Sequence, residues 1–193
     1  GDAAELLERP AEQVLRHDPR AAAGGEVRVA RDVGGLDADV HRAVAETDHH
    51  HPLYDSRVII EYLAHVAGNK TLIPDDGVKR FRILTLQALS QGLADVCVAY
   101  RYETAARPLG LQWADWMART EQRINAAIDD MDRNWQAELT DVTAGTIAMA
   151  VALAYIDFRL PAFKWRDTRP NLSAFHEKFS ARESMLKTAL SAS

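Results

Sequence analysis

Cysteine is almost absent from this 193-residue chain, and positive charge is not in excess. Cys97 is the only cysteine, so no disulfide can form within the chain and a reducing, cytoplasmic setting is expected. No signal-peptide pattern opens the chain, and no apolar run is expected to cross a membrane. The net charge of -5 gives no basis for binding nucleic acid.

The composition changes abruptly at residue 52. Residues 1–52 contain no Ser, Asn, Lys, Ile, Met, Phe, Tyr, Trp or Cys, and they carry 6 basic and 11 acidic residues. The whole net charge of -5 therefore lies in this segment, because the rest of the chain has 17 charges of each sign. The chain as a whole is 47% hydrophobic and can bury a core, but this segment has few large apolar groups.

Local patterns within residues 1–52 are short. Residues 3–17 place several apolar side chains on one side of a helix, which predicts a helix there. The alternation of Val27 and Val29 predicts a strand over residues 26–33, and glycine pairs break the pattern on both sides.

The histidines predict no metal site. His49, His50 and His51 are consecutive, so their side chains point in different directions, and their spacing matches no zinc pattern. His65 and His176 are expected to be exposed residues on helices.

A regular series of helices is predicted after residue 53. Asp55 or Ser56 is a good N-cap for the first helix, and Gly68 ends it. The predicted ranges are 55–67, 78–105, 112–135, 142–158, 171–180 and 183–190. The fourth range is apolar all round, which indicates a buried central helix, and Thr140 or Asp141 is expected to cap it.

Three blocks of this helical region resemble bacterial glutathione S-transferases over residues 53–193. The first is residues 53–63, LYDSRVIIEYL, and the second is residues 81–103, FRILTLQALSQGLADVCVAYRYE. The third spans residues 141–188, from DVTAGTIAMAVALAYIDF to RPNLSAFHEKFSARESMLKT. Their order and spacing are those of the family's all-α domain.

The resemblance implies a mostly α fold of the glutathione S-transferase type. An all-α C-terminal domain is expected over residues 78–193. A thioredoxin-like α/β half is expected over residues 1–75, with residues 1–52 atypical. The family usually forms two-fold dimers, so a homodimer is expected.

The same resemblance assigns Asp55 and Ser56 to glutathione. The Ser56 hydroxyl and backbone N–H would hold the γ-glutamyl carboxylate at a helix N-terminus, where the helix dipole favours an anion. The Asp55 carboxylate would pair with the amino group of the peptide. The alternative is that both residues form only a plain N-cap.

The resemblance places Tyr100 and Tyr102 in the family's pocket for the electrophile. A tyrosine there would hydrogen-bond the substrate, and the alternative is a partly buried packing aromatic. Cys97 lies between Val96 and Val98, so it is expected to be a small buried hydrophobe and not a reactive thiol.

The first 52 residues depart from the family. The family's catalytic Tyr, Ser or Cys lies early in the thioredoxin-like half, but no such residue precedes Tyr54, so the catalytic residue is unknown. The family's Val-Pro pair is also missing. Three interpretations remain open: a divergent thioredoxin-like half, a poorly ordered acidic arm, or a frame-shifted translation that rejoins the family's reading frame near Leu53.

The expected function is conjugation of the glutathione thiolate to a small hydrophobic electrophile, with glutathione as co-substrate. The alternative is a non-catalytic helical binding or interaction protein on the same scaffold. Glutathione-dependent thiol transfer is a third interpretation, but it needs an N-terminal cysteine that the chain lacks.

Overall fold

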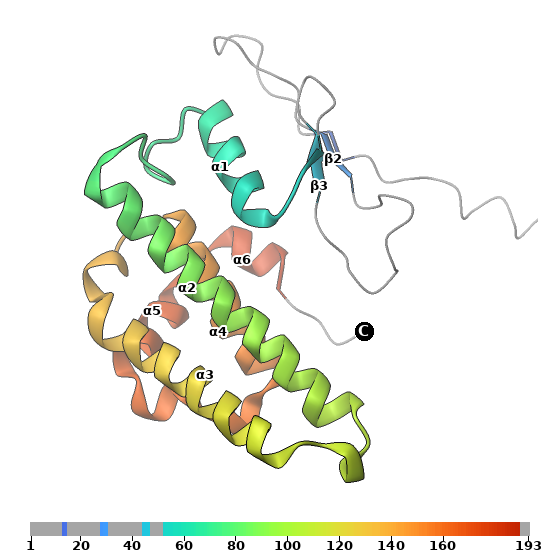
Figure 1. The fold of residues 1–193 in the computed structure, drawn as a ribbon. Helices are drawn as coiled ribbons and strands as arrows, with labels where there is room; N and C mark the ends of the chain where they lie inside the picture. Colours follow the sequence, from blue (N-terminus) through green and yellow to red (C-terminus); the bar gives the residue numbers. More distant parts are fainter. Residues whose placement is uncertain (1–12, 15–27, 31–43, 47–51, 190–193) are drawn as a thin grey trace, which may run out of the picture. The chain divides into compact units, whose positions relative to one another are not determined.

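The computed structural model describes residues 13–14, 28–30, 44–46 and 52–189. The chain divides into two compact units, Gly1–Lys70 and Thr71–Ser193. In the part of the chain that the structure describes, the first unit holds a small sheet and one helix, and the second is helical (Figure 1). The atypical character predicted for residues 1–52 falls largely outside the described residues.

The sheet of the first unit has four short strands, which pair in the order β1-β2-β3-β4 and are antiparallel throughout. They are β1 (Gln13–Val14), β2 (Arg28–Ala30), β3 (Val44–Glu46) and β4 (Pro52–Leu53). The strand predicted over residues 26–33 is confirmed at β2. The prediction of a helix over residues 3–17 is wrong at β1, because Val14 pairs there with Arg28 of β2. Strand pairing overrides the local helical pattern.

Helix α1 (Ser56–Val66) follows β4 and begins and ends where the sequence predicts. Ile59 and Ala64 are its buried residues. After its last turn the chain turns back at Gly68, whose φ of 62° lies in the left-handed region. The N–H groups of Gly68 and Asn69 donate to the carbonyls of His65 and Ala64, which satisfies two carbonyls that the helix end would leave unpaired.

Residues 71–189 of the second unit form five α-helices joined by short single-turn elements. In Figure 1, α2 and α3 run side by side, with α4 behind them. The α-helices are α2 (Gly77–Arg101), α3 (Ala114–Asn134), α4 (Ala144–Arg159), α5 (Pro170–Ser180) and α6 (Glu183–Lys187). The single-turn elements are η1 (Tyr102–Ala106), η2 (Leu109–Leu111), η3 (Gln136–Glu138), η4 (Pro161–Phe163) and η5 (Trp165–Thr168).

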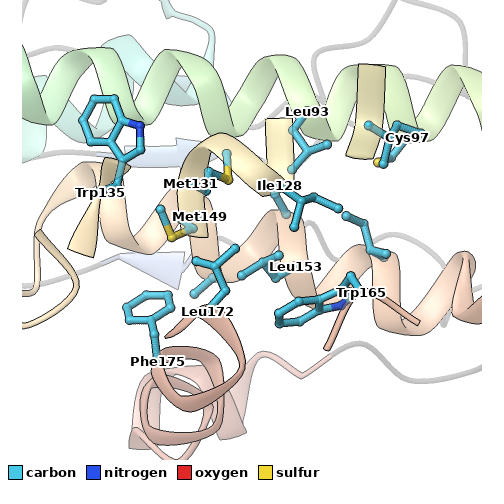
Figure 2. Close-up of a cluster of buried hydrophobic side chains, with 14 of the residues drawn as sticks. Leu93, Cys97, Ile128, Met131, Trp135, Met149, Leu153, Trp165, Leu172 and Phe175 are labelled. Atoms are coloured by element: carbon cyan, nitrogen blue, oxygen red, sulfur yellow. The ribbon is translucent and has the colours of Figure 1, made fainter. Parts of the chain in front are cut away.

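Helix α4 is the centre of the core, as its apolar composition predicts. Met149 and Leu153 are completely buried on it, and side chains from α2, α3, α5 and η5 surround them (Figure 2). Those surrounding residues include Leu93, Cys97, Ile128, Met131, Leu172, Phe175 and Trp165. Each fully buried side chain of this size contributes roughly 1.5–3 kcal/mol to folding.

The cap of α4 differs from the predicted one. Thr143 is the N-cap, and its hydroxyl oxygen accepts from the N–H of Thr146 at 3.2 Å. The Thr146 hydroxyl oxygen accepts from the N–H of Thr143 at 2.9 Å and donates to the carbonyl of Asp141 at 2.8 Å. The expectation of a cap at Thr140 or Asp141 is wrong, because a second threonine takes the place that Glu or Gln has in the usual capping box.

A close approach between α2 and α4 depends on Gly145. A Cβ atom at this position would lie 2.9 Å from the backbone oxygen of Ile83 and 3.0 Å from the Cβ of Leu86. Real Cβ atoms do not come this close to backbone oxygen, so a side chain here would push the two helices apart.

Replacing this glycine tests the close approach. Gly145→Ala is expected to lower the free energy of unfolding by about 1–3 kcal/mol, because the added methyl overpacks the α2–α4 contact. Gly92→Ala is the matched control, since a Cβ at Gly92 meets no atom within 4 Å and alanine favours a helix by about 0.5–1 kcal/mol. Urea unfolding measures the free energy of unfolding of both variants. A change in the same direction in both would contradict the close approach at Gly145.

One described helical stretch passes a composition test for a membrane span. Gly77–Ala106 is long enough and has a mean hydropathy of 1.2 over its best window, which corrects the expectation that no such run exists. Ile83, Leu86 and Leu93 of α2 are buried in the helical unit, and a core helix meets the same test.

Candidate functional site

The N-terminus of α1 holds the two residues predicted to bind glutathione. Asp55 is the N-cap, and its Oδ1 accepts from the N–H of Arg57 at 3.0 Å. Ser56 is the first residue of the helix and is exposed. The structure thus brings the two residues together at the positive end of a helix dipole, and Asp55 also serves as the plain cap.

Arg57 joins this site, although it is not among the residues predicted to bind glutathione. Its Nε and Nη2 donate to Asp55 Oδ1 and Oδ2 at 3.3 and 3.1 Å. Both side chains are partly exposed, so the ion pair contributes less than about 1 kcal/mol to stability. The guanidinium nevertheless places a cation beside the helix N-terminus. The signal that could have found it is an arginine two residues after an acidic N-cap.

Tyr100 lines a pocket of about 450 Å³ between the end of α2, helix α3 and η4. Its hydroxyl donates to the Glu121 carboxylate, and its ring packs edge-on against Phe163 with centroids 5.6 Å apart. Burial, and then the carboxylate of Glu121, raise the pKa of Tyr100 to about 12. The phenol therefore stays protonated at neutral pH and serves as a hydrogen-bond donor.

Tyr102 lines a different pocket, also of about 450 Å³. It lies in η1, is 61% exposed, and shares this pocket with Trp113 and Trp116 from the start of α3. The two tyrosines predicted for one site are therefore separated. The reason is helical geometry, because residues two apart in a helix point to different faces.

Cys97 is completely buried in the core, as predicted. Burial raises the pKa of its thiol to about 12, so almost no thiolate exists at neutral pH. Cys97 is not a candidate nucleophile.

His176 is buried, so the expectation of an exposed residue is wrong. Its Nε2 donates to the carbonyl of Ala150 on α4 at 3.1 Å, and its Nδ1 accepts from Nη2 of Arg166 at 2.7 Å. The ring also packs edge-on against Trp165. The partners of His176 lie 10 and 26 residues away in sequence, which is why a local pattern misses them.

Stability is expected to depend on the protonation of His176. Burial first, and then the Arg166 guanidinium, lower its pKa below 6.5, while Asp157 and the Ala150 carbonyl act in the opposite direction. The unfolded chain then binds the proton more readily than the folded chain. The contribution of His176 to the free energy of unfolding is therefore fully present above about pH 6.5. It falls as the pH drops toward and through the lower pKa of the folded state, by up to about 1.4 kcal/mol per pH unit.

Urea unfolding at pH 7.5, 6.5 and 5.5 measures this dependence. His176→Gln should flatten the decline below pH 6.5, and His65→Gln, on the exposed side of α1, should leave it as in the wild type. An unchanged decline in His176→Gln would assign the pH dependence to other groups.

Metal chemistry finds no support in the part of the chain that the structure describes. No group of three or more His, Cys, Asp or Glu side chains in that part is placed to hold a metal ion. The run at residues 49–51 lies outside the described residues.

Comparison with known proteins places the chain in a family. No known family profile matches it. A protein of Escherichia coli K12, described as the uncharacterized GST-like protein YibF, is 30% identical over 138 residues, which are 70% of this chain and 68% of that protein. The chain belongs to the glutathione S-transferase-like family. The recognition made from the three sequence blocks is thereby confirmed.

Solved glutathione transferases share its fold. A glutathione transferase family member from Pseudomonas fluorescens Pf-5, with bound glutathione, is 38% identical, with a TM-score of 0.74 over 78% of this chain and 74% of that one. A glutathione S-transferase from Methylobacillus flagellatus KT, also with glutathione bound, is 27% identical, with a TM-score of 0.69 over 77% and 75% of the two chains. The mostly α, glutathione S-transferase-like fold class is confirmed.

Proposed function

We propose that this glutathione S-transferase-like protein binds glutathione at the N-terminus of α1 and conjugates its thiolate to a small hydrophobic electrophile. The observation that carries the proposal is the placement of Asp55 and Ser56 at the start of α1. Solved relatives that contain glutathione support it.

The chemistry of this end of the helix suits the γ-glutamyl group of glutathione. Its carboxylate is an anion, and the Ser56 hydroxyl, the helix dipole and the nearby Arg57 guanidinium all favour an anion. Its ammonium group is a cation, which the Asp55 carboxylate favours. A zwitterionic ligand therefore meets both signs of charge within three consecutive residues.

Conjugation requires a second site for the electrophile. The glutathione sulfur forms a bond to the electrophilic carbon, and the leaving group departs with the displaced electron pair. Tyr100 and Tyr102 are the proposed contacts, one in each of two pockets of the helical unit. The hydroxyl of Tyr100 donates its one proton to the Glu121 carboxylate, so it offers the electrophile its ring and the lone pairs of its oxygen.

A non-catalytic binding protein on the same scaffold is the second candidate. It is favoured by one observation, the lack of any Tyr, Ser or Cys before Tyr54 that could stabilise the thiolate. Both candidates share the glutathione site. For both candidates we also propose that the protein is a homodimer, as is usual in the family. We further propose a cytoplasmic location, because a chain with a single thiol suits a reducing compartment.

Calorimetric titration of the full chain with glutathione tests the proposal. Ser56→Ala removes a hydrogen bond to a charged group and should weaken binding about 10- to 100-fold. Asp55→Asn keeps an N-cap acceptor but removes the charge, so it should weaken binding without melting α1. Asp76→Ala is the matched control, because Asp76 is the N-cap of α2 and its side chain makes no cap hydrogen bond.

The outcomes separate clearly. Binding by the wild type and Asp76→Ala, with loss in both site variants, supports the proposed site. If the folded wild type does not bind, or if all variants bind equally, glutathione recognition at α1 is wrong. If the wild type binds glutathione, its steady-state rate of conjugation decides between the enzyme and the non-catalytic protein.

A further inference from the structure

We propose that His176, Asp157 and Arg166 form a switch that responds to acid. Uptake of a proton at Nδ1 of His176 transfers Oδ2 of Asp157 from Arg166 to His176 and releases the Arg166 guanidinium. The release loosens η5, which lies between α4 and α5. Neither the switch nor its test involves glutathione, so both are independent of the proposed function.

One nitrogen of Arg166 joins the three side chains. Nη2 donates to Oδ2 of Asp157 on α4 and to Nδ1 of His176 on α5, and the second of these bonds is 2.7 Å long. Nδ1 accepts a hydrogen bond only while it carries no proton, which requires the neutral ring with its proton on Nε2. Nε2 lies 3.1 Å from the carbonyl oxygen of Ala150, and the bond between them fixes that tautomer.

A proton on Nδ1 turns this contact from attraction into repulsion. The nitrogen becomes a donor that faces the N–H of Arg166, and two cations then lie 2.7 Å apart. In the part of the chain that the structure describes, the charged groups that act on the ring are Arg166 and Asp157. Burial and the Arg166 guanidinium both lower the pKa of His176, so the ring holds a proton only when an anion pairs with it.

Arg166, and not His176, is the partner that moves. The His176 side chain is 6% exposed, its Nε2 is bonded to α4, and its ring packs edge-on against Trp165. The Arg166 side chain is 36% exposed, so its guanidinium can turn into water and remain solvated there. The repulsion is therefore relieved on the side of η5.

Asp157 is already placed to pair with the protonated ring. Its Oδ2 lies 3.9 Å from Nδ1 of His176, so a small movement makes a hydrogen bond once Arg166 has left. Its Oδ1 keeps the bond from Nε1 of Trp165 at 2.7 Å, which anchors the carboxylate. The Ser180 hydroxyl, 3.3 Å from Nδ1, is another acceptor, but it is neutral and stabilises the charge less well.

The release loosens η5 because the Arg166 guanidinium ties this turn to its surroundings. It joins η5 to α4 through Asp157, and its Cζ lies 4.4 Å from the ring centroid of Trp165. Lys164, the N-cap of η5, makes no side-chain cap hydrogen bond and has a φ of 40°. A residue other than glycine keeps this left-handed conformation only where its surroundings hold it. Proton uptake is therefore expected to loosen residues 164–168.

NMR of the full chain between pH 7.5 and 5 tests the switch. The ring resonances of His176 report its proton, and the order parameter of the Arg166 Nε–H reports the release. In the wild type this order parameter should fall below about 0.6, with the same midpoint as the His176 titration. Arg82 is the matched control, because it also pairs with a carboxylate, that of Glu138, and lies 4.4 Å over the ring of Trp135. Its described contacts include no histidine, so its order parameter should stay constant.

Three variants assign the proton and its partner. His176→Gln takes up no proton, so Arg166 should stay ordered at both ends of the pH range. Asp157→Asn removes the anion and should move the His176 midpoint to lower pH, whereas Ser180→Ala should leave it unchanged.

The wild-type titration alone can refute the switch. It does so if Arg166 stays ordered down to pH 5, or if its release has a midpoint different from that of His176. Release of Arg166 in His176→Gln would also refute it. A larger change of midpoint in Ser180→Ala than in Asp157→Asn would overturn the role given to Asp157.

Discussion

Trp165→Ala is expected to lower the free energy of unfolding by about 3–5 kcal/mol, the largest effect of any single substitution discussed for this chain. Trp165 is 1% exposed and lies in the core beside α4 (Figure 2). Its Nε1 donates to Oδ1 of Asp157 at 2.7 Å, and its ring packs edge-on against His176. The substitution therefore opens a large cavity and removes the donor to Oδ1 of Asp157, whose Oδ2 stays paired with Arg166.

Urea unfolding followed by circular dichroism measures this loss. Trp113→Ala is the matched control, because Trp113 is 58% exposed and its truncation should change stability by less than about 0.5 kcal/mol. A loss below about 1 kcal/mol for Trp165→Ala would contradict the position of this tryptophan in the core.

Asp132→Ala is expected to lower the free energy of unfolding by about 2–4 kcal/mol, because α5 has no side-chain cap of its own. Asp132, on α3, is 8% exposed. Its Oδ1 accepts from the N–H of Leu172 at 3.0 Å, and its Oδ2 accepts from Nδ2 of Asn171 at 3.2 Å. A residue 40 positions away thus caps α5, and its charge suits the helix N-terminus.

The same unfolding experiment distinguishes the charge from the hydrogen bond. Asp132→Asn keeps one acceptor for the Leu172 N–H, so it should lose about half as much stability as the alanine variant. Asp115→Ala, at an exposed position of α3, should change stability by less than about 0.5 kcal/mol. If Asp132→Ala and Asp115→Ala changed the free energy of unfolding equally, the cap that Asp132 provides to α5 would contribute nothing to stability.

Local sequence predicts most of the helical unit because each helix carries its own signals. Apolar periodicity locates the helices, Pro161 and Pro170 mark breaks between them, and Gly68 ends α1. The all-round apolar composition of α4 indicates its central position before any contact is known.

What local sequence misses are contacts between residues far apart in the chain. His176 looks like an exposed helix residue until α4 supplies the Ala150 carbonyl and η5 supplies Arg166. Likewise, Gln13–Val14 is a strand because it pairs with β2, not because of its own pattern. The Thr143 cap was missed for a different reason, since its partner Thr146 is not the usual acidic or amide residue.

The candidate site, too, is predicted from the sequence only in part. Asp55 and Ser56 were identified from the family resemblance, and the structure places both at the start of α1, while their role in binding stays a prediction. Tyr100 and Tyr102 were assigned to one pocket, although their spacing already argues for two faces of a helix. Arg57 entered only with the structure, because its side chain folds back onto Asp55.

The most direct test of the account is to locate the bound glutathione on the full chain by ¹⁵N–¹H NMR. Binding at α1 predicts saturable shifts that are largest at the backbone amides of Ser56, Arg57 and Val58, and that need about 10- to 100-fold more glutathione in Ser56→Ala. Shifts confined to the helical unit, or no shifts at saturating glutathione, would contradict the proposal that α1 recognises this ligand.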